Sequence, residues 1–189
     1  MKRYGFLKRL VEKIRDELII AGVSPTNHEL FSIKDLPTSF YMRHSLGMAS
    51  SIGLGLSLAQ PDKKVIVLEG DGGLLMNLGS LATISTQQPK NLIIFILDNR
   101  CYENTGCQPT ATAHQTRLDA IARGAGIEKA YRWQDMGDLE SNLDKVLIEE
   151  GPTVVVVEIE TGRETNTMIN IGTVENKLRF MRAIAGNQS

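Results

Sequence analysis

The 189-residue chain has little of what marks a nucleic-acid-binding or membrane protein. Its 21 basic and 22 acidic residues nearly cancel, so there is no excess of positive charge for nucleic acid or an anionic membrane surface. The longest weakly polar stretch, residues 46–59, is interrupted by serine and glycine and falls short of the roughly 20 residues that span a bilayer. We therefore expect neither nucleic acid nor a membrane as a partner.

Cysteine is also scarce, since Cys101 and Cys107 are the only two. Their spacing matches neither a CxxC redox pair nor a four-ligand zinc site. The basic segment 2–9 continues as amphipathic sequence and lacks the apolar core of a signal peptide. These features predict a cytoplasmic protein in which both cysteines are reduced thiols.

What is present is an ordinary globular composition, 42% hydrophobic and 23% charged, over a length that suits one domain spanning residues 1–189. Continuous apolar runs indicate strands buried on both faces at 65–68, 92–97 and 154–157. Helical patterns separate or flank them at 74–87, 116–124 and 137–149. Strands joined through helices are parallel, so the sequence predicts a three-layer α/β (αβα) domain with a mainly parallel sheet and ligands beyond the carboxyl ends of its strands.

Helical spacing predicts three further helices. Apolar residues from Phe6 to Ile19 favour one amphipathic helix over residues 3–21, which ends near Gly22. The Gly- and Ala-rich segment 45–59 is typical of a helix packed closely on a sheet. A last helix is expected at 174–186, and the short apolar run 30–33 is left without an assignment.

The first apolar strand runs directly into the sequence Gly70 to Gly73, with Asp71 at the strand tip. Glycines let the backbone approach a ligand closely, and the free amides at a helix start suit an anion such as phosphate. Taken alone, this sequence is explained equally well by a tight turn, because Gly and Asp dominate turns for local reasons.

A second strand tip strengthens the case. The strand at 92–97 is followed by Asp98 and Asn99, so neighbouring tips offer a carboxylate and an amide. Mg²⁺ takes few protein oxygens and completes its octahedron with water and phosphate oxygens. The residues therefore predict a Mg²⁺–diphosphate site, without identifying the molecule that carries the diphosphate.

A Gly-Asp-Gly sequence followed after 25 residues by an acidic-or-amide–Asn pair is similar to the cofactor motif of thiamin-diphosphate-dependent enzymes. Within that family the chain most resembles the β subunit of sulfopyruvate decarboxylase and the C-terminal half of phosphonopyruvate decarboxylase. The resemblance implies the thiamin-diphosphate-binding fold. It runs through residues 45–47, 49–53, 70–79, 98–99, 102 and 105–110.

The resemblance also implies a set of site residues. The Mg²⁺ ligands would be the side chains of Asp71 and Asn99 and the backbone carbonyl of Cys101, whose thiol takes no part. Leu46 matches the apolar residue that supports the bent cofactor. The remaining implied cofactor contacts are Ser45, Gly47, Gly70, Gly72, Gly73 and Tyr102.

The chain departs from the family pattern at three positions. His44 stands where relatives often have Gly, and its near-neutral titration suits proton transfer, although a structural role explains it too. Asp98 replaces the first Asn of an Asn-Asn pair. Cys101 corresponds to a frequent Gly. His44 is thus a candidate catalytic residue, whereas His28 and His114 are expected at the surface.

The implied activity is non-oxidative decarboxylation of a small 2-oxoacid such as sulfopyruvate or phosphonopyruvate, the former in coenzyme M biosynthesis. Arg43, Arg100 or a partner could bind the anionic group, and the Thr-rich loop 105–112 could contact an anion or act as a lid. Alternatives are a non-catalytic thiamin diphosphate binder, an acetolactate-synthase-like ligase or a 2-oxoacid oxidoreductase subunit, the last disfavoured by too few cysteines for a cluster.

The resemblance further implies a partner. In the family a glutamate from a separate pyrimidine-binding domain activates the cofactor, and we expect no room for that domain in this chain. Glu69 precedes the metal loop and is expected at the wrong end of the cofactor. We therefore expect a separate pyrimidine-binding α subunit that supplies this glutamate, a hetero-oligomer and self-association of the pairs.

Overall fold

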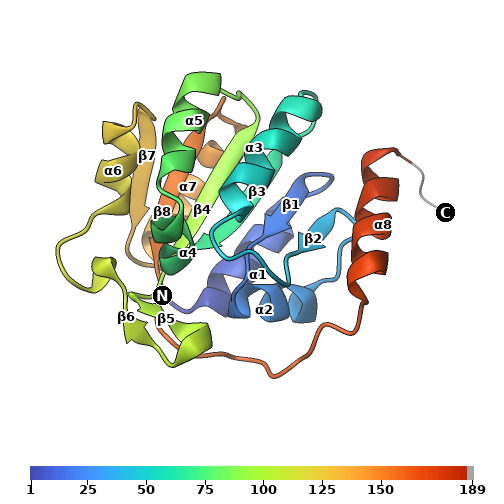
Figure 1. Ribbon diagram of the computed structural model, residues 1–189, viewed down its shortest axis with the longest axis horizontal. Helices are drawn as coiled ribbons and strands as arrows, with labels where there is room; N and C mark the ends of the chain where they lie inside the picture. Colours follow the sequence, from blue (N-terminus) through green and yellow to red (C-terminus); the bar gives the residue numbers. More distant parts are fainter. Residues whose placement is uncertain (187–189) are drawn as a thin grey trace.

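The computed structural model describes residues 1–186. Its centre is a six-stranded parallel sheet of order β2-β1-β3-β4-β8-β7, with helices on both faces (Figure 1). This architecture confirms the predicted three-layer α/β fold. The strands are β1 (Leu18–Ala21), β2 (Ser39–Tyr41), β3 (Val65–Gly70), β4 (Leu92–Asp98), β7 (Lys129–Trp133) and β8 (Thr153–Glu158).

The central strands alternate their side chains between two cores. Ile93, Phe95 and Leu97 of β4 enter one core, while the residues between them enter the other. Every residue of β4 is buried, which explains its unbroken apolar run. The first core is covered by α1 (Arg3–Lys13), α2 (Pro25–Ile33) and α7 (Met136–Ile148), and the second by α3 (Ala49–Ala59), α4 (Asp71–Met76), α5 (Gly79–Gln87), α6 (Leu118–Gly124) and α8 (Thr173–Ile184).

The predicted N-terminal helix is too long. Helix α1 ends at Lys13, and Leu18–Ala21 forms β1, an inner strand between β2 and β3. Leu18 and Ile19 continue the helical spacing of the residues before them, which caused the error. All four β1 residues are buried, with neighbouring strands on both sides. Residues 30–33 lie in α2.

The expected helix at 45–59 begins only at Ala49, because residues 45–47 form a loop with positive φ at Ser45 and Gly47. From Ala49 on, it packs closely on the sheet as predicted. A Cβ atom on Gly53 would lie 2.2 Å from Val67 Cγ2 of β3. The expected helix at 74–87 begins earlier, at Asp71, and is divided into α4 and α5.

Two smaller features follow β4. Strands β5 (Cys101–Tyr102) and β6 (Gln108–Pro109) form an antiparallel hairpin around the 3-10 helix η1 (Glu103–Thr105), and the 3-10 helix η2 (Ala111–Ala113) comes next. Across residues 1–186, every helix is too short or too polar to cross a bilayer.

The topology leaves a crevice between two neighbouring strands. Strands β1 and β3 lie side by side, but the chain leaves β1 towards α2 on one face and leaves β3 towards α4 on the other (Figure 1). Ligands of open α/β sheets bind at such a divergence, beyond the carboxyl ends of the strands. A ligand of this protein is therefore expected there.

Candidate functional site

A pocket lies at the carboxyl ends of β1, β3, β4 and β8. It is lined by residues that follow these strands and by the β5–β6 hairpin. The lining residues are Arg3, Val23, Ser24, Pro25, Thr26, Leu46, Gly70, Asp71, Gly72, Gly73, Leu97, Asn99, Cys101, Tyr102, Glu103, Asn104, Thr105 and Ile159. The pocket thus joins the two strand tips that the sequence singled out.

Asp71 is the first residue of α4 and is 2% exposed. Its Oδ2 accepts a hydrogen bond from the Thr110 hydroxyl at 2.6 Å, and the Thr112 hydroxyl lies 3.2 Å away. Burial raises the pKa of Asp71 to about 6, the Thr110 hydrogen bond opposes this rise, and the charge of Asp98 adds to it. A buried carboxylate beside a second acidic group favours a bound cation. The threonines of the 105–112 loop hold this carboxylate in place.

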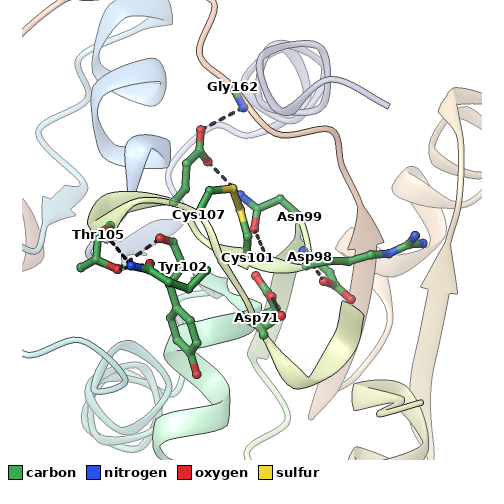
Figure 2. The surroundings of a disulfide bond; sticks show 12 residues. Asp71, Asp98, Asn99, Cys101, Tyr102, Thr105, Cys107 and Gly162 are labelled. Atoms are coloured by element: carbon green, nitrogen blue, oxygen red, sulfur yellow. Dashed lines mark hydrogen bonds between the residues drawn. A yellow bond between two sulfur atoms is a disulfide. The ribbon is translucent and has the colours of Figure 1, made fainter. Parts of the chain in front are cut away.

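Asn99 follows β4 and has both ends of its amide engaged (Figure 2). Its Nδ2 donates to Glu103 Oε2 at 2.8 Å, and its Oδ1 accepts the backbone N–H of Cys101 at 3.1 Å. A carbonyl oxygen has a second lone pair, so Oδ1 keeps the capacity to bind a cation.

Cys101 and Cys107 form a disulfide bond, which corrects the expectation of two reduced thiols (Figure 2). The hairpin reverses through Gly106 and Cys107, both at positive φ, and brings the two Cα atoms to 4.8 Å. That separation lies within the range that a disulfide requires. Spacing along the sequence does not reveal the hairpin, and so it did not predict the bond.

The glycines after β3 are packed against neighbouring side chains. A Cβ atom on Gly72 would lie 2.5 Å from Tyr102 Cε1, and one on Gly73 would lie 2.3 Å from Glu69 Oε1. A Cβ atom on Gly70, by contrast, would have no neighbour within 4 Å in the described part of the chain. Larger residues at 72 and 73 would displace the side chains of Tyr102 and Glu69, so close packing explains why both positions are glycine.

The loop before α3 reaches the pocket through one side chain. Leu46 lines it and is 38% exposed. Gly47 packs against the glycine loop 70–73, since a Cβ atom there would lie 2.9 Å from the Gly73 carbonyl oxygen. His44 and Ser45 are exposed, and neither they nor Gly47 line the pocket. The catalytic role of His44 stays a prediction.

The two arginines considered for substrate binding are engaged elsewhere. Arg43 Nη2 donates to the carbonyls of Ile169 and Ile171, at 3.1 and 2.8 Å. Arg100 pairs with Glu158 at 2.7 Å. Neither arginine lines the pocket.

Glu69, His28 and His114 also lie outside the pocket. Glu69 is 2% exposed, and burial raises its pKa to about 7. His28 Nδ1 lies 3.1 Å from the Thr167 carbonyl oxygen, and His114 is exposed.

The sequence reasoning missed two parts of the pocket. The first is the start of α2, where Ser24 caps the helix by accepting the Thr26 N–H at 3.2 Å and Pro25 occupies the first turn. A Ser-Pro pair is a known helix-start signal that could have revealed it. The second is the pair Arg3 and Glu103, which only the tertiary structure brings together.

The ligands that these residues offer fit a magnesium ion whose coordination is completed by phosphate oxygens. Within residues 1–186 no group of three His, Cys, Asp or Glu side chains could hold a metal by itself. Asp71, Asn99 and the Cys101 backbone instead offer one carboxylate, one amide oxygen and one carbonyl beside the same pocket. Mg²⁺ is commonly bound by one or two carboxylates together with phosphate oxygens.

Comparison with known proteins decides the family. The family model of the thiamine pyrophosphate enzyme C-terminal TPP-binding domain matches residues 24–157. The chain belongs to this family. This match confirms the family that the cofactor motif predicted from the sequence.

Relatives within the family differ in how much of their own length this chain covers. It is 41% identical over 184 residues to the sulfopyruvate decarboxylase subunit beta of Methanocaldococcus jannaschii, covering 97% of each protein. It is 35% identical to the phosphonopyruvate decarboxylase of Streptomyces viridochromogenes, covering 85% of this chain but 40% of that protein.

The solved thiamine diphosphate-dependent 4-hydroxybenzoylformate decarboxylase of Rhodococcus jostii RHA1 superimposes with a TM-score of 0.69 at 21% identity, over 87% of this chain and 33% of that one. This similarity confirms the fold. The relatives support the expected β-type subunit of a thiamin-diphosphate-dependent decarboxylase, whereas the roles of individual site residues stay predictions.

Proposed function

We propose that this chain is the β-type subunit of a Mg²⁺- and thiamin-diphosphate-dependent decarboxylase of a sulfopyruvate- or phosphonopyruvate-like 2-oxoacid. A separate pyrimidine-binding α subunit completes its active site. The observation that carries the proposal is the convergence of Asp71, Asn99 and Cys101 with the glycine loop 70–73 in one pocket. Relatives named subunit beta match the chain along nearly their whole length, which supports the division into subunits.

The residues of the chain bind and orient the cofactor. Asp71 and Asn99 hold Mg²⁺ through side-chain oxygens, and Cys101 contributes its backbone carbonyl. The amides of the glycine loop bind the diphosphate in the pocket that the start of α2 also lines. Leu46 supports the cofactor from the loop before α3. Bound thiamin diphosphate supplies the electron sink for decarboxylation.

The carboxylates within the described part of the pocket do not replace the activating glutamate. Glu103 lines the pocket, but it is held by Arg3, Asn99 and the Gly162 N–H. Glu69 lies behind Gly73 and does not line the pocket. We assign the activating carboxylate to the α subunit for this reason.

An exposed apolar surface beside the pocket suits that subunit. Leu46, Met48, Ile52 and Met76 are 38, 42, 36 and 62% exposed. Asn77 ties this surface together, since its Nδ2 donates to the Gly47 carbonyl and to the Ser51 hydroxyl. Because Leu46 belongs to both the surface and the pocket, a subunit bound here would cover the cofactor.

The cation that binds the anionic group of the substrate is also assigned to the partner. Arg43 and Arg100 are both engaged and lie outside the pocket, and Arg3 is paired with Glu103. We assign the cation that recognises a sulfonate or phosphonate to the α subunit. Substrate choice then depends on the subunit that accompanies this chain.

The test is release of CO₂ from sulfopyruvate and from phosphonopyruvate by the chain mixed with the pyrimidine-binding subunit. We expect turnover of one of them in the mixture and none with either subunit alone. Asp71→Ala abolishes turnover, while Asp62→Ala, at an exposed site, preserves it. A mixture that binds cofactor but releases no CO₂, or that forms an acetolactate-type product, contradicts the proposal.

A further inference from the structure

The amide of Asn99 must present one particular atom to a metal. Its two ends are similar in shape, but only Oδ1 can bind a cation, because Nδ2 is a donor without a free lone pair. Nδ2 lies 2.8 Å from Glu103 Oε2. An ionised carboxylate only accepts hydrogen bonds, so turning the amide over would bring two acceptors together. Together with the Cys101 N–H, which donates to Oδ1 at 3.1 Å, Glu103 therefore favours the orientation in which the second lone pair of Oδ1 can bind the metal.

Glu103 is held by segments distant in the sequence. Arg3 Nη2 of α1 donates to its Oε2 at 2.5 Å, and the Gly162 N–H, after β8, donates to its Oε1 at 2.9 Å. The side chains of Arg3 and Glu103 are 3 and 13% exposed. Gly162 lies outside the hairpin, on the segment that follows β8 (Figure 2). The carboxylate consequently has little freedom to turn away from Asn99.

Stability alone explains this arrangement poorly. A buried ion pair is a weak source of stability, since desolvation offsets much of the attraction between the charges. The arginine is also incompletely satisfied. Among residues 1–186, Arg3 Nη1 has no hydrogen-bond partner and lies 3.9 Å from Glu29 Oε2, which has none either. A role in orienting Asn99 accounts for the pair more directly.

We propose that Glu103 is a positioning residue, held by Arg3, which fixes the amide of Asn99 with its oxygen towards Mg²⁺. The inference rests on the proposed function, because it assigns a purpose to Asn99 as a metal ligand. Groups that orient metal ligands typically contribute 10- to 100-fold to metal affinity. Glu103 acts through Asn99 and does not touch the metal.

The first test compares two isosteric substitutions by calorimetry, in the full chain with its pyrimidine-binding subunit present. The quantity measured is the Mg²⁺ concentration that half-saturates thiamin diphosphate binding. Glu103→Gln should raise it about tenfold or more. Glu29→Gln is the matched control, because it removes another buried carboxylate beside Arg3 without contact to Asn99. Equal effects of the two substitutions contradict the inference.

The second test exchanges the two functional groups. In Asn99→Asp two carboxylates face each other, so Mg²⁺-dependent binding should weaken. Adding Glu103→Gln to Asn99→Asp lets the new amide donate to Asp, so binding should tighten again. Glu103→Gln thus has opposite effects in the two backgrounds, which a merely structural role does not produce. Weakening in both backgrounds overturns the inference.

Failure of the inference is separable from failure of the proposed function. A wild-type complex without Mg²⁺-dependent binding contradicts the proposed function itself. Normal wild-type binding with unchanged Glu103→Gln contradicts only the positioning role. Circular dichroism checks folding, and Glu103→Asp provides a second variant that keeps the charge but withdraws it from Asn99. Unchanged Mg²⁺ affinity in Glu103→Asp also contradicts the inference.

Discussion

Asp71 is deeply buried and directly follows the carboxyl end of β3. Thr110 and Thr112 hold one of its oxygens, and the neighbouring Asp98 is also acidic and buried. The pKa of Asp71 rises to about 6, mainly because burial disfavours its charge. A metal ion reverses that preference, because it binds only the ionised carboxylate.

Cofactor binding should therefore depend on pH. Mg²⁺-dependent thiamin diphosphate binding should be about tenfold weaker at pH 5 than at pH 7, since Asp71 is mostly protonated one unit below its pKa of about 6. Calorimetry measures this, with Mg²⁺ binding to free thiamin diphosphate titrated in parallel as the control. Equal protein-dependent affinities at the two pH values would contradict the assignment.

The same shift has a consequence for stability without metal. The folded pKa of Asp71 lies above its ordinary value of 3.8, so the folded state binds the proton more tightly than the unfolded chain. This tighter proton binding stabilises the folded state fully below about pH 4, and the stabilisation is lost as the pH rises through about 6. Mg²⁺ with thiamin diphosphate should restore stability above that range.

At the scale of elements, the sequence predicted the strands that are buried and continuous. Strands β3, β4 and β8 were predicted correctly because each is a short, continuous apolar run without the 3.6-residue spacing of an amphipathic helix. Strand β1 was assigned to a helix because Leu18 and Ile19 fit the helical spacing that precedes them. Strand β7, at the sheet edge, is only partly buried and short, so it left no clear pattern.

The packing of α3 on β3 gives a stability prediction. Gly53→Ala should lower the free energy of unfolding by about 1–3 kcal/mol, because its Cβ would lie 2.2 Å from Val67 Cγ2. Gly55 is on the same helix, and a Cβ atom there would have no neighbour within 4 Å among residues 1–186, so Gly55→Ala should stabilise the protein by up to about 1 kcal/mol. Urea unfolding measures both. Equal effects would show that α3 does not pack closely on β3.

The hairpin disulfide gives a second prediction at this scale. Replacing Cys101 and Cys107 together by Ser should lower the free energy of unfolding, because the disulfide restricts the unfolded chain. The loss should be only about 2 kcal/mol, since the loop that the disulfide closes is short. Urea unfolding of the oxidised wild type and the double variant measures the difference. Wild type treated with a reductant is the control and should resemble the variant. Two alkylatable thiols in untreated protein would contradict the disulfide.

At the scale of the whole molecule, the site is a product of topology. Asp71 and Asn99 were predictable because each directly follows a recognisable strand and parallel strands end at the same edge of the sheet. Arg3 and Glu103 were not, because they are 100 residues apart and meet only through the placement of α1. Side-chain pairs of this kind depend on packing and leave no local pattern.

We assign the missing part of the site to another subunit. In the proposed function the chain provides the metal and diphosphate end of the pocket, and the partner covers the exposed apolar surface of Leu46, Met48, Ile52 and Met76. This division predicts that metal-dependent cofactor binding requires Asp71 and is strengthened when the pyrimidine-binding subunit is added.

The most direct test is calorimetric titration of the chain with thiamin diphosphate and Mg²⁺, alone and with the pyrimidine-binding subunit. We predict binding that requires Mg²⁺, that is tighter with the partner than without it, and that Asp71→Ala abolishes. Binding that is independent of Mg²⁺, or that Asp71→Ala retains at wild-type affinity, would contradict the central claim that this chain holds the metal–diphosphate end of the cofactor.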